Sequence, residues 1–190
     1  MAKADREMRA RALAVLAETL DVGKTVAQVP GLTRAALRAI LLDAASDKPA
    51  SRRSGKVKRV TIYTDGASRG NPGLAGAGVV LRSDDGRVLG RVARFLGEMT
   101  NNMAEYTALL IGLKEAAKTG AEEVEIRSDS ELLVRQLSGR YKVKNEALQI
   151  MHGSAMDLLG TFKRWKAEHI RREKNKEADQ LANNAIDDRD

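Results

Sequence analysis

The chain has 190 residues, of which 43% are hydrophobic and 31% are charged, and a formal net charge of +7. That length suffices for one ordinary domain with a real core and a small appendage. Because there is no Cys, a disulfide framework, a thiolate zinc site and a Cys nucleophile are excluded, and two His do not suggest a multi-histidine metal site. No apolar run approaches the ~18 residues of a membrane span, and the N-terminus lacks an apolar signal core, so we expect a cytoplasmic protein without membrane contact.

The positive charge is concentrated near the N-terminus. Residues 1–60 hold 13 Lys and Arg against 6 Asp and Glu, whereas residues 61–190 hold 20 of each kind. The segment 46–60 alone has six Lys and Arg against one Asp. Such a segment can bind a polyanion without sequence preference, because its cations replace the counterions of phosphates. It can equally be a solubilising linker, and composition leaves both interpretations open.

The first 58 residues are predicted to form a small helical module and a linker. Apolar residues recur at helical spacing over 3–20 and again over 33–45, where Thr33 is a suitable N-cap. We therefore expect a helical module over 1–45, followed by a basic flexible linker over 46–58. The module's pattern fits a helix-turn-helix DNA reader, but it fits any other helical hairpin as well.

From residue 59 onward the pattern predicts an α/β domain over 59–187, with a short tail over 188–190. The expected strands are 60–64, 74–81, 88–96, 124–127 and 162–170, and the expected helices are 103–118, 131–137, 146–159 and 176–186. In chain order this is βββαβααβα. Three antiparallel strands, followed by two strands that are reached through helical crossovers, imply a five-stranded mixed sheet flanked by helices.

Four carboxylates fall at the ends of these expected elements. Asp65 and Asp129 follow the first and fourth strands, and Glu105 and Asp179 fall in the first turns of two helices. If the two strands are parallel neighbours, the carboxylates converge, repel one another and call for a hard divalent cation. Taken singly, each has a simpler explanation, as a turn residue or as a complement to a helix dipole.

Four motifs in this region resemble those of type 1 ribonuclease H. They are DGASRGNPG over 65–73, TNNMAEY over 100–106, SDS over 128–130 and NKEADQLAN over 175–183. Their order and spacing match that family, and the resemblance covers about residues 58–187. It implies a ribonuclease H-like fold and an endonuclease that hydrolyses the RNA strand of RNA/DNA hybrids with two Mg²⁺ ions, for which Mn²⁺ can substitute. The products would carry 5′-phosphate and 3′-hydroxyl ends.

The resemblance also implies roles for individual residues. The metal-binding carboxylates would be Asp65, Glu105, Asp129 and Asp179. The substrate-binding residues would be Gly66, Asn71, Thr100, Asn101, Asn102, Ser130 and Asn145. Of these, Gly66 begins a Gly-rich turn that would let the backbone approach a nucleic-acid strand, and the Asn side chains would read 2′-hydroxyls and base edges. A simpler interpretation is that Asn101 and Asn102 cap one helix and Asn145 caps the next.

His169 precedes Asp179 by ten residues, as the mobile-loop histidine of the family does. The resemblance therefore implies a role in proton transfer or product release. Alternatively, its imidazole packs beneath the loop 171–174. We assign no role to the other histidine, His152, beyond surface or core packing.

Two departures from the family affect substrate binding. The segment 138–145 runs straight into the next helix, so the basic handle of many bacterial members is absent, and Glu131 stands where Gln is common. A Glu there is unfavourable for a polyanion. We hypothesise that the basic linker, together with the helical module, supplies the affinity that the handle would otherwise provide.

Three functions are compatible with these observations. The first is a hybrid-specific endoribonuclease, which we expect to be a monomer. The second is a broader nuclease that also cuts double-stranded RNA or hybrid junctions. The third is a non-catalytic nucleic-acid-binding protein on the same fold, against which the four carboxylates argue, because a binder of polyanions gains nothing from clustered negative charge.

Overall fold

The computed structural model describes residues 57–188, so the predicted helical module and most of the predicted linker lie outside the described residues. The elements, in chain order, are β1 (Arg59–Ser68), β2 (Gly73–Ser83), β3 (Val88–Met99), α4 (Asn101–Lys118), β4 (Glu123–Ser128), α5 (Glu131–Leu137), α6 (Glu146–Leu159), β5 (Arg164–His169), the 3₁₀ turn η1 (Arg172–Lys174) and α7 (Lys176–Asp187). This confirms the predicted order βββαβααβα. Within the described range, no helix combines the length and apolar character needed to cross a membrane.

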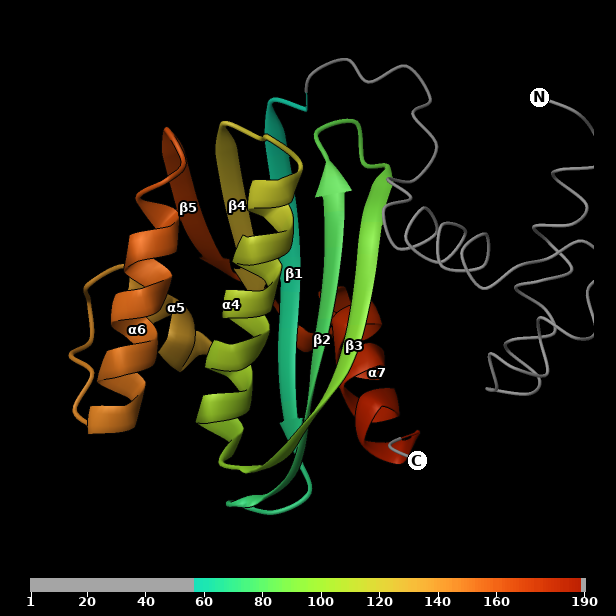
Figure 1. Cartoon of the computed structure of the whole chain (residues 1–190), viewed down its shortest axis with the longest axis vertical. Coiled ribbons are helices and arrows are strands. Elements are labelled where there is room, and N and C mark those ends of the chain that lie inside the picture. Colours follow the sequence, from blue (N-terminus) through green and yellow to red (C-terminus); the bar gives the residue numbers. More distant parts are fainter. Residues whose placement is uncertain (1–56, 189–190) are drawn as a thin grey trace, which may run out of the picture. The chain divides into compact units, whose positions relative to one another are not determined.

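The five strands form one mixed sheet in the order β3-β2-β1-β4-β5. The pairs β1–β2 and β2–β3 are antiparallel, whereas β1–β4 and β4–β5 are parallel, as predicted. Helices α4 and α6 pack together on one side of the sheet, and α7 lies on the other side against β2, β3 and β1 (Figure 1). The core fills the space between α4 and the central strands, where Ile62, Leu109 and Ile126 are fully buried.

Two element boundaries differ from the prediction and move functional residues. Strand β1 does not end at Asp65 but continues to Ser68, because β2 keeps pairing with it as far as Ser68↔Ala75. Helix α4 begins at Asn101, two residues earlier than predicted, so that Glu105 falls in its second turn rather than its first. Both differences arise where a polar segment joins a regular element, and apolar periodicity does not mark such a junction.

Helix α7 lies very close to β2 because glycine faces it. A Cβ on Gly78 would lie 1.9 Å from the carbonyl oxygen of Ala178, and one on Gly76 would lie 2.3 Å from that of Ala182. Ala178 and Ala182 are themselves completely buried. These small residues let the helix and strand backbones approach each other, and this packing fixes the position of the start of α7.

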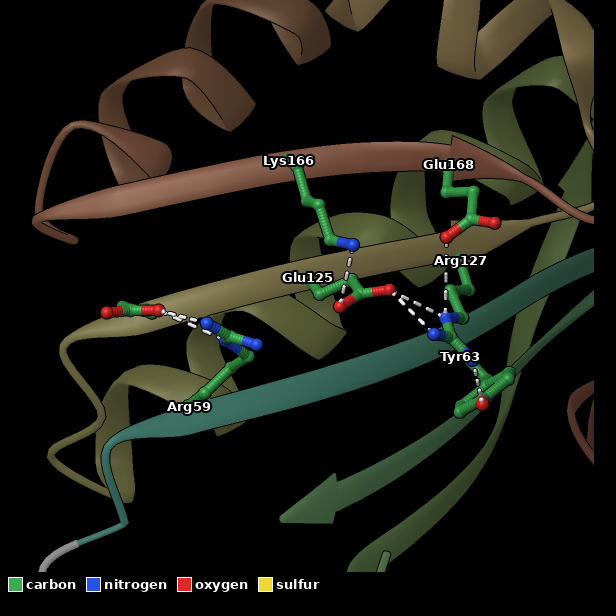
Figure 2. A network of polar contacts seen from close by, with 7 residues as sticks. Arg59, Tyr63, Glu125, Arg127, Lys166 and Glu168 are labelled. Carbon is green, nitrogen blue, oxygen red and sulfur yellow. Dashed lines mark hydrogen bonds and ion pairs between the residues drawn. The ribbon is translucent and has the colours of Figure 1, made fainter. Parts of the chain in front are cut away.

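The sheet face away from α4 carries a ladder of charged side chains over β1, β4 and β5 (Figure 2). Glu125 is only 5% exposed, yet its carboxylate forms ion pairs with Arg127 at 2.8 Å and with Lys166 at 3.1 Å. Arg127 in turn donates to the Tyr63 hydroxyl at 2.8 Å. Burial opposes the ionisation of Glu125, but its two cationic partners outweigh that effect and lower its pKa. The ladder therefore compensates the charges of this face through pairs between neighbouring strands.

Candidate active site

Parallel pairing of β1 with β4 brings the first two carboxylates to one place. The last paired residues are Thr64 and Ser128, and Asp65 and Asp129 are the next residues on each strand. On β1 the chain stays in the sheet, where Asp65 pairs with Gly78, whereas β4 ends and Ser130 caps α5. The two carboxylates therefore emerge side by side where the two strands part.

Helix α4 supplies Glu105. Thr100 caps the helix by accepting the backbone N–H of Met103 at 3.4 Å. The helix then passes directly over Gly66, where a Cβ would lie 2.2 Å from the Glu105 backbone nitrogen. Gly66 is therefore a buried strand residue beneath α4, and its predicted place at the start of a Gly-rich turn is wrong. Its lack of a side chain brings Glu105 close to Asp65.

The Glu105 carboxylate is held by two hydrogen bonds. The Ser130 hydroxyl donates to one oxygen at 2.5 Å, and the Asn101 side-chain amide donates to the other at 3.0 Å. Burial and the nearby Asp129 charge raise the pKa of Glu105, while these two hydrogen bonds act in the opposite direction. Asn101 and Ser130 therefore orient an acidic side chain at the site.

Helix α7 supplies Asp179 in its first turn, as predicted. The Asp179 backbone N–H donates to the Asn175 carbonyl at 3.0 Å, and its own carbonyl accepts from the Asn183 amide at 2.8 Å. Its carboxylate accepts a charge-assisted hydrogen bond from Arg172 at 2.6 Å. Asp179 is thus fixed at the backbone, and its side chain is paired with a cation.

One buried amide links three of these elements. Asn175, at the N-terminal end of α7, is 1% exposed. Its side-chain nitrogen donates to the Thr64 carbonyl at 3.0 Å and to Asp129 Oδ1 at 2.6 Å. Asn175 therefore connects the end of the β1–β4 pairing to the start of α7.

All four carboxylates line one cleft of about 310 Å³. Its walls include the predicted residues Asp65, Gly66, Asn101, Glu105, Asp129, Ser130 and Asp179, together with Ala67, Ser68, Arg172 and Asn183. Arg172 and Asn183 received no role from the sequence. Asn183 could have been found by its spacing of one helical turn from Asp179, whereas Arg172 lies in a charged loop where nothing distinguishes it from Arg171 or Lys174.

The cleft concentrates negative charge around the partly buried carboxylate of Asp65. Burial and then the charges of Asp129, Asp179 and Glu105 raise the pKa of Asp65 to about 7, against a smaller opposing effect of Arg172. Oxygen donors that repel one another in this way suit a hard divalent cation, which would relieve the repulsion. Within residues 57–188, no three acidic or histidine side chains lie close enough together to hold one metal ion between them.

The remaining predicted substrate residues lie around the cleft rather than in it. Asn71 is exposed, and its Oδ1 accepts the Asn101 backbone N–H at 3.2 Å. Asn102 and Asn145 line a second groove of about 570 Å³ with Arg140, Tyr141, Lys142 and Lys144. Asn145 also caps α6, accepting the Leu148 N–H at 3.0 Å. The capping interpretation is thus confirmed for Asn145 and wrong for Asn101 and Asn102, because Thr100 caps α4.

Two further residues stand differently from the sequence expectations. His169 is exposed at the end of β5 and does not line the described cleft, so its catalytic role stays a prediction. Glu131 forms an ion pair with Arg135 at 2.5 Å, and the Arg135 guanidinium lies over the Tyr141 ring. The expected penalty of Glu131 toward a polyanion is therefore offset by its own partner.

Comparisons with known proteins agree with this geometry. The reverse transcriptase-like family matches residues 63–185. Over 130 residues the chain is 44% identical to Ribonuclease HI of Halobacterium salinarum and 45% identical to a bifunctional protein of Mycobacterium tuberculosis. Each alignment covers 68% of this chain, but 65% of the Halobacterium protein and 36% of the mycobacterial one. The chain thus spans less than two thirds of the length of these relatives.

One solved structure resembles this chain, and the similarity extends over nearly the whole length of that solved protein. It is LC11-RNase H1, from an enzyme isolated from compost by a metagenomic approach, in complex with an RNA/DNA hybrid. The sequence identity is 43% and the TM-score 0.65, with 68% of this chain and 97% of that chain covered. Because the sequence family, the sheet order and the solved structure all agree, the chain belongs to the ribonuclease H family.

Proposed function

We propose that this protein is an endoribonuclease that hydrolyses the RNA strand of RNA/DNA hybrids with divalent metal ions and leaves 5′-phosphate and 3′-hydroxyl ends. The observation that carries the proposal is the cleft in which Asp65, Glu105, Asp129 and Asp179 converge. A binding protein gains nothing from such a cluster, because a polyanion is repelled by it. The hybrid as substrate is supported by the 43% identical relative whose structure contains one.

The four carboxylates are the proposed ligands of two Mg²⁺ ions, with Mn²⁺ as a substitute. The donor set fits because it offers only hard oxygen ligands. Burial, followed by the charges of the neighbouring carboxylates, raises the pKa of Asp65, and a bound cation would oppose that effect. When bound, such ions lower the pKa of the attacking water and stabilise the leaving 3′-oxygen. Asp65, on the central strand between the other carboxylates, is the proposed shared ligand.

The protein's own groups orient these ligands and the substrate. Ser130 and Asn101 hold Glu105, and Asn175 holds Asp129, so that each carboxylate keeps a defined direction. The second groove, with Lys142 and Lys144 beside Asn145, is the proposed path of a nucleic-acid backbone leaving the cleft. Asn71, Thr100 and Asn102 complete the proposed substrate contacts, and His169 is proposed to assist proton transfer or product release.

The test is cleavage of one end-labelled RNA strand, presented alone, in an RNA/DNA hybrid and in double-stranded RNA, with Mg²⁺ or Mn²⁺. We expect cutting of the hybrid only, lost in Asp65→Asn and Asp129→Asn while hybrid binding persists. The variant Asp157→Asn, in the distant helix α6, is the matched control and should cut normally.

The other outcomes separate the remaining functions. Binding of the hybrid without cutting under either metal would favour the non-catalytic function. Cutting of double-stranded RNA as well would favour the broader nuclease. Wild-type rates in Asp65→Asn would remove the assignment of the cleft as the active site.

We also propose that the basic segment 46–60 adds non-specific affinity for nucleic acid. The described catalytic region lacks the basic handle of many relatives, and the excess of Lys and Arg lies in the first 60 residues. Lys and Arg in such a segment contact phosphates without reading bases. The segment would therefore increase residence on the substrate without changing where it is cut.

A further inference from the structure

We infer that Arg172 is a positioning residue that serves as an internal counter-ion for Asp179 and that Asp179 must leave it in order to take up metal. This inference rests on the proposed function, because it deepens the role of one of the four carboxylates. The Arg172 Nη2 lies 2.6 Å from Asp179 Oδ1. Within the part of the chain that the structure describes, Arg172 is the one cationic residue among those that line the cleft.

The positive charge of Arg172 acts on three of the four carboxylates of the cleft. Its hydrogen bond to Asp179, followed by the charges of Asp179, Asp65 and Asp129, raises the pKa of the guanidinium. In return, Arg172 is the cation that opposes the raised pKa of Asp65. A guanidinium in this position does, in part, what a divalent cation would do: it compensates carboxylates that repel one another.

The local fold makes this pairing easy to form and to release. Arg172 begins the turn η1, in which the Asn175 N–H donates to the Arg172 carbonyl at 2.9 Å. Asn175 directly precedes α7, so the two charged side chains stand on adjoining elements. The Arg172 side chain is 73% exposed and that of Asp179 26% exposed. Because an exposed ion pair is weak, side-chain rotation alone can separate it without disturbing the backbone.

The carboxylates have different kinds of hydrogen-bond partner, and this difference identifies Asp179 as the carboxylate that must change its partner when metal binds. Glu105 and Asp129 are oriented by uncharged donors, Ser130, Asn101 and Asn175, which can remain in place when a cation binds. Asp179 is instead paired with a cation, and two cations on the same carboxylate oxygen repel each other.

The consequence is a competition that can be measured without catalysis. Titration of the metal-free full-length chain with Mg²⁺ alone, followed by calorimetry, reports the affinity directly. Arg172→Ala should bind Mg²⁺ more tightly than the wild type, by up to about fivefold, the range expected for an exposed ion pair. A merely structural role would give the opposite result, because a loosened loop would weaken metal binding.

Thermal unfolding supplies a second readout. Without metal, Arg172→Ala should melt below the wild type, because Asp179 loses its counter-ion. At saturating Mg²⁺ the two melting temperatures should converge, because the ion pair no longer exists in either protein. A difference that persisted at saturating Mg²⁺ would show that Arg172 supports the fold, and would overturn the proposal.

Two controls separate direct pairing from a general effect of charge. Arg171→Ala removes a neighbouring exposed cation that does not line the cleft, and should leave Mg²⁺ affinity unchanged. In an Asp179→Asn background, removal of Arg172 should no longer tighten binding, because the competing pair is already absent. Equal tightening in Arg171→Ala, or undiminished tightening in the Asp179→Asn background, would overturn the proposal. A failure of hybrid cleavage would leave these binding results intact, so the two proposals fail independently.

Discussion

The Asn175 side chain donates a hydrogen bond to Asp129 Oδ1 at 2.6 Å across 46 residues of sequence. The same nitrogen donates to the Thr64 carbonyl, so one amide joins β1, the end of β4 and the start of α7. The Asn175 Oδ1 is buried without a hydrogen-bond partner in the described structure. A buried polar atom of this kind costs stability. The amide therefore contributes more to the direction of Asp129 than to the stability of the fold.

This relationship predicts that Asn175→Ala will impair cleavage more than folding. The substitution removes two hydrogen bonds but also the unsatisfied Oδ1, so the free energy of unfolding should fall by only about 1–2 kcal/mol. The cleavage rate, measured with hybrid well below the melting temperature, should fall at least about tenfold because Asp129 loses its orientation. The exposed Asn184→Ala on the same helix is the control and should change neither quantity. A rate that fell only in proportion to the folded fraction would contradict the positioning role.

The elements and the convergence of carboxylates could be predicted from the sequence because their signals are local. Helices α5 and α6 begin and end at the predicted residues. A polar N-cap marks the start of each helix, and the periodic apolar face shows how far it extends. The placement of Asp65 and Asp129 side by side followed from one topological assumption, parallel pairing of their strands, which the register confirms.

What could not be predicted depends on contacts between distant segments. The extension of β1 to Ser68 requires β2 as a partner, and the burial of Gly66 requires α4 above it. The roles of Arg172 and Asn175 depend on where their side chains end, which neither periodicity nor composition specifies. Gly66 illustrates the difficulty, because a glycine after an aspartate signals a turn as readily as a close approach of two backbones.

The close approach of α7 to β2 predicts a large effect of Gly78→Ala. The new Cβ would lie 1.9 Å from the Ala178 carbonyl oxygen and 2.6 Å from the Ala182 nitrogen, so the helix would have to move. We expect a loss of about 3 kcal/mol or more in the free energy of unfolding, measured by urea denaturation. Displacement of α7 would also move Asp179.

Gly153→Ala is the matched control for that substitution. Gly153 is exposed within α6, and a Cβ there meets no atom within 4 Å. Because alanine favours a helix interior over glycine, this variant should gain about 0.5–1 kcal/mol. Equal effects of the two substitutions would contradict the close packing of α7.

The proposed role of the basic linker predicts a change in the salt dependence of hybrid binding. The test variant carries Gln in place of Arg52, Arg53, Lys56 and Lys58. If each of these side chains contacts a phosphate, the slope of log affinity against log salt should become shallower by up to about 3.6, and affinity at low salt should fall. Fluorescence anisotropy with a labelled hybrid measures both.

The control for the linker has the same change in net charge elsewhere. It carries Gln in place of Lys3, Arg6, Arg9 and Arg11. Its slope should remain close to that of the wild type. An unchanged slope in the linker variant, or an equal change in the control, would contradict a specific contribution of the segment 46–60.

The raised pKa of Asp65 predicts how stability depends on pH in the metal-free protein. The carboxyl has a pKa of about 7 in the folded chain, against an ordinary value of 3.8, so the folded state binds its proton more tightly. The stability contributed by that proton is complete below about pH 4 and is lost as the pH rises toward 7. Asp65→Asn has no such group. The variant's melting temperature, relative to that of the wild type, should therefore rise between pH 4 and 7 and level off above.

Asp85→Asn provides a control with the opposite sign. Hydrogen bonds from the Ser83 hydroxyl and the Arg87 backbone lower the pKa of Asp85, so its charge stabilises the folded state above its ordinary pKa. Relative to the wild type, Asp85→Asn should lose stability at neutral pH and recover as the pH falls below 4.

Saturating Mg²⁺ should abolish the advantage of Asp65→Asn at pH 8, because the cation compensates the wild-type carboxylates. An advantage that did not change with pH would show that burial and neighbouring charges do not control the Asp65 proton.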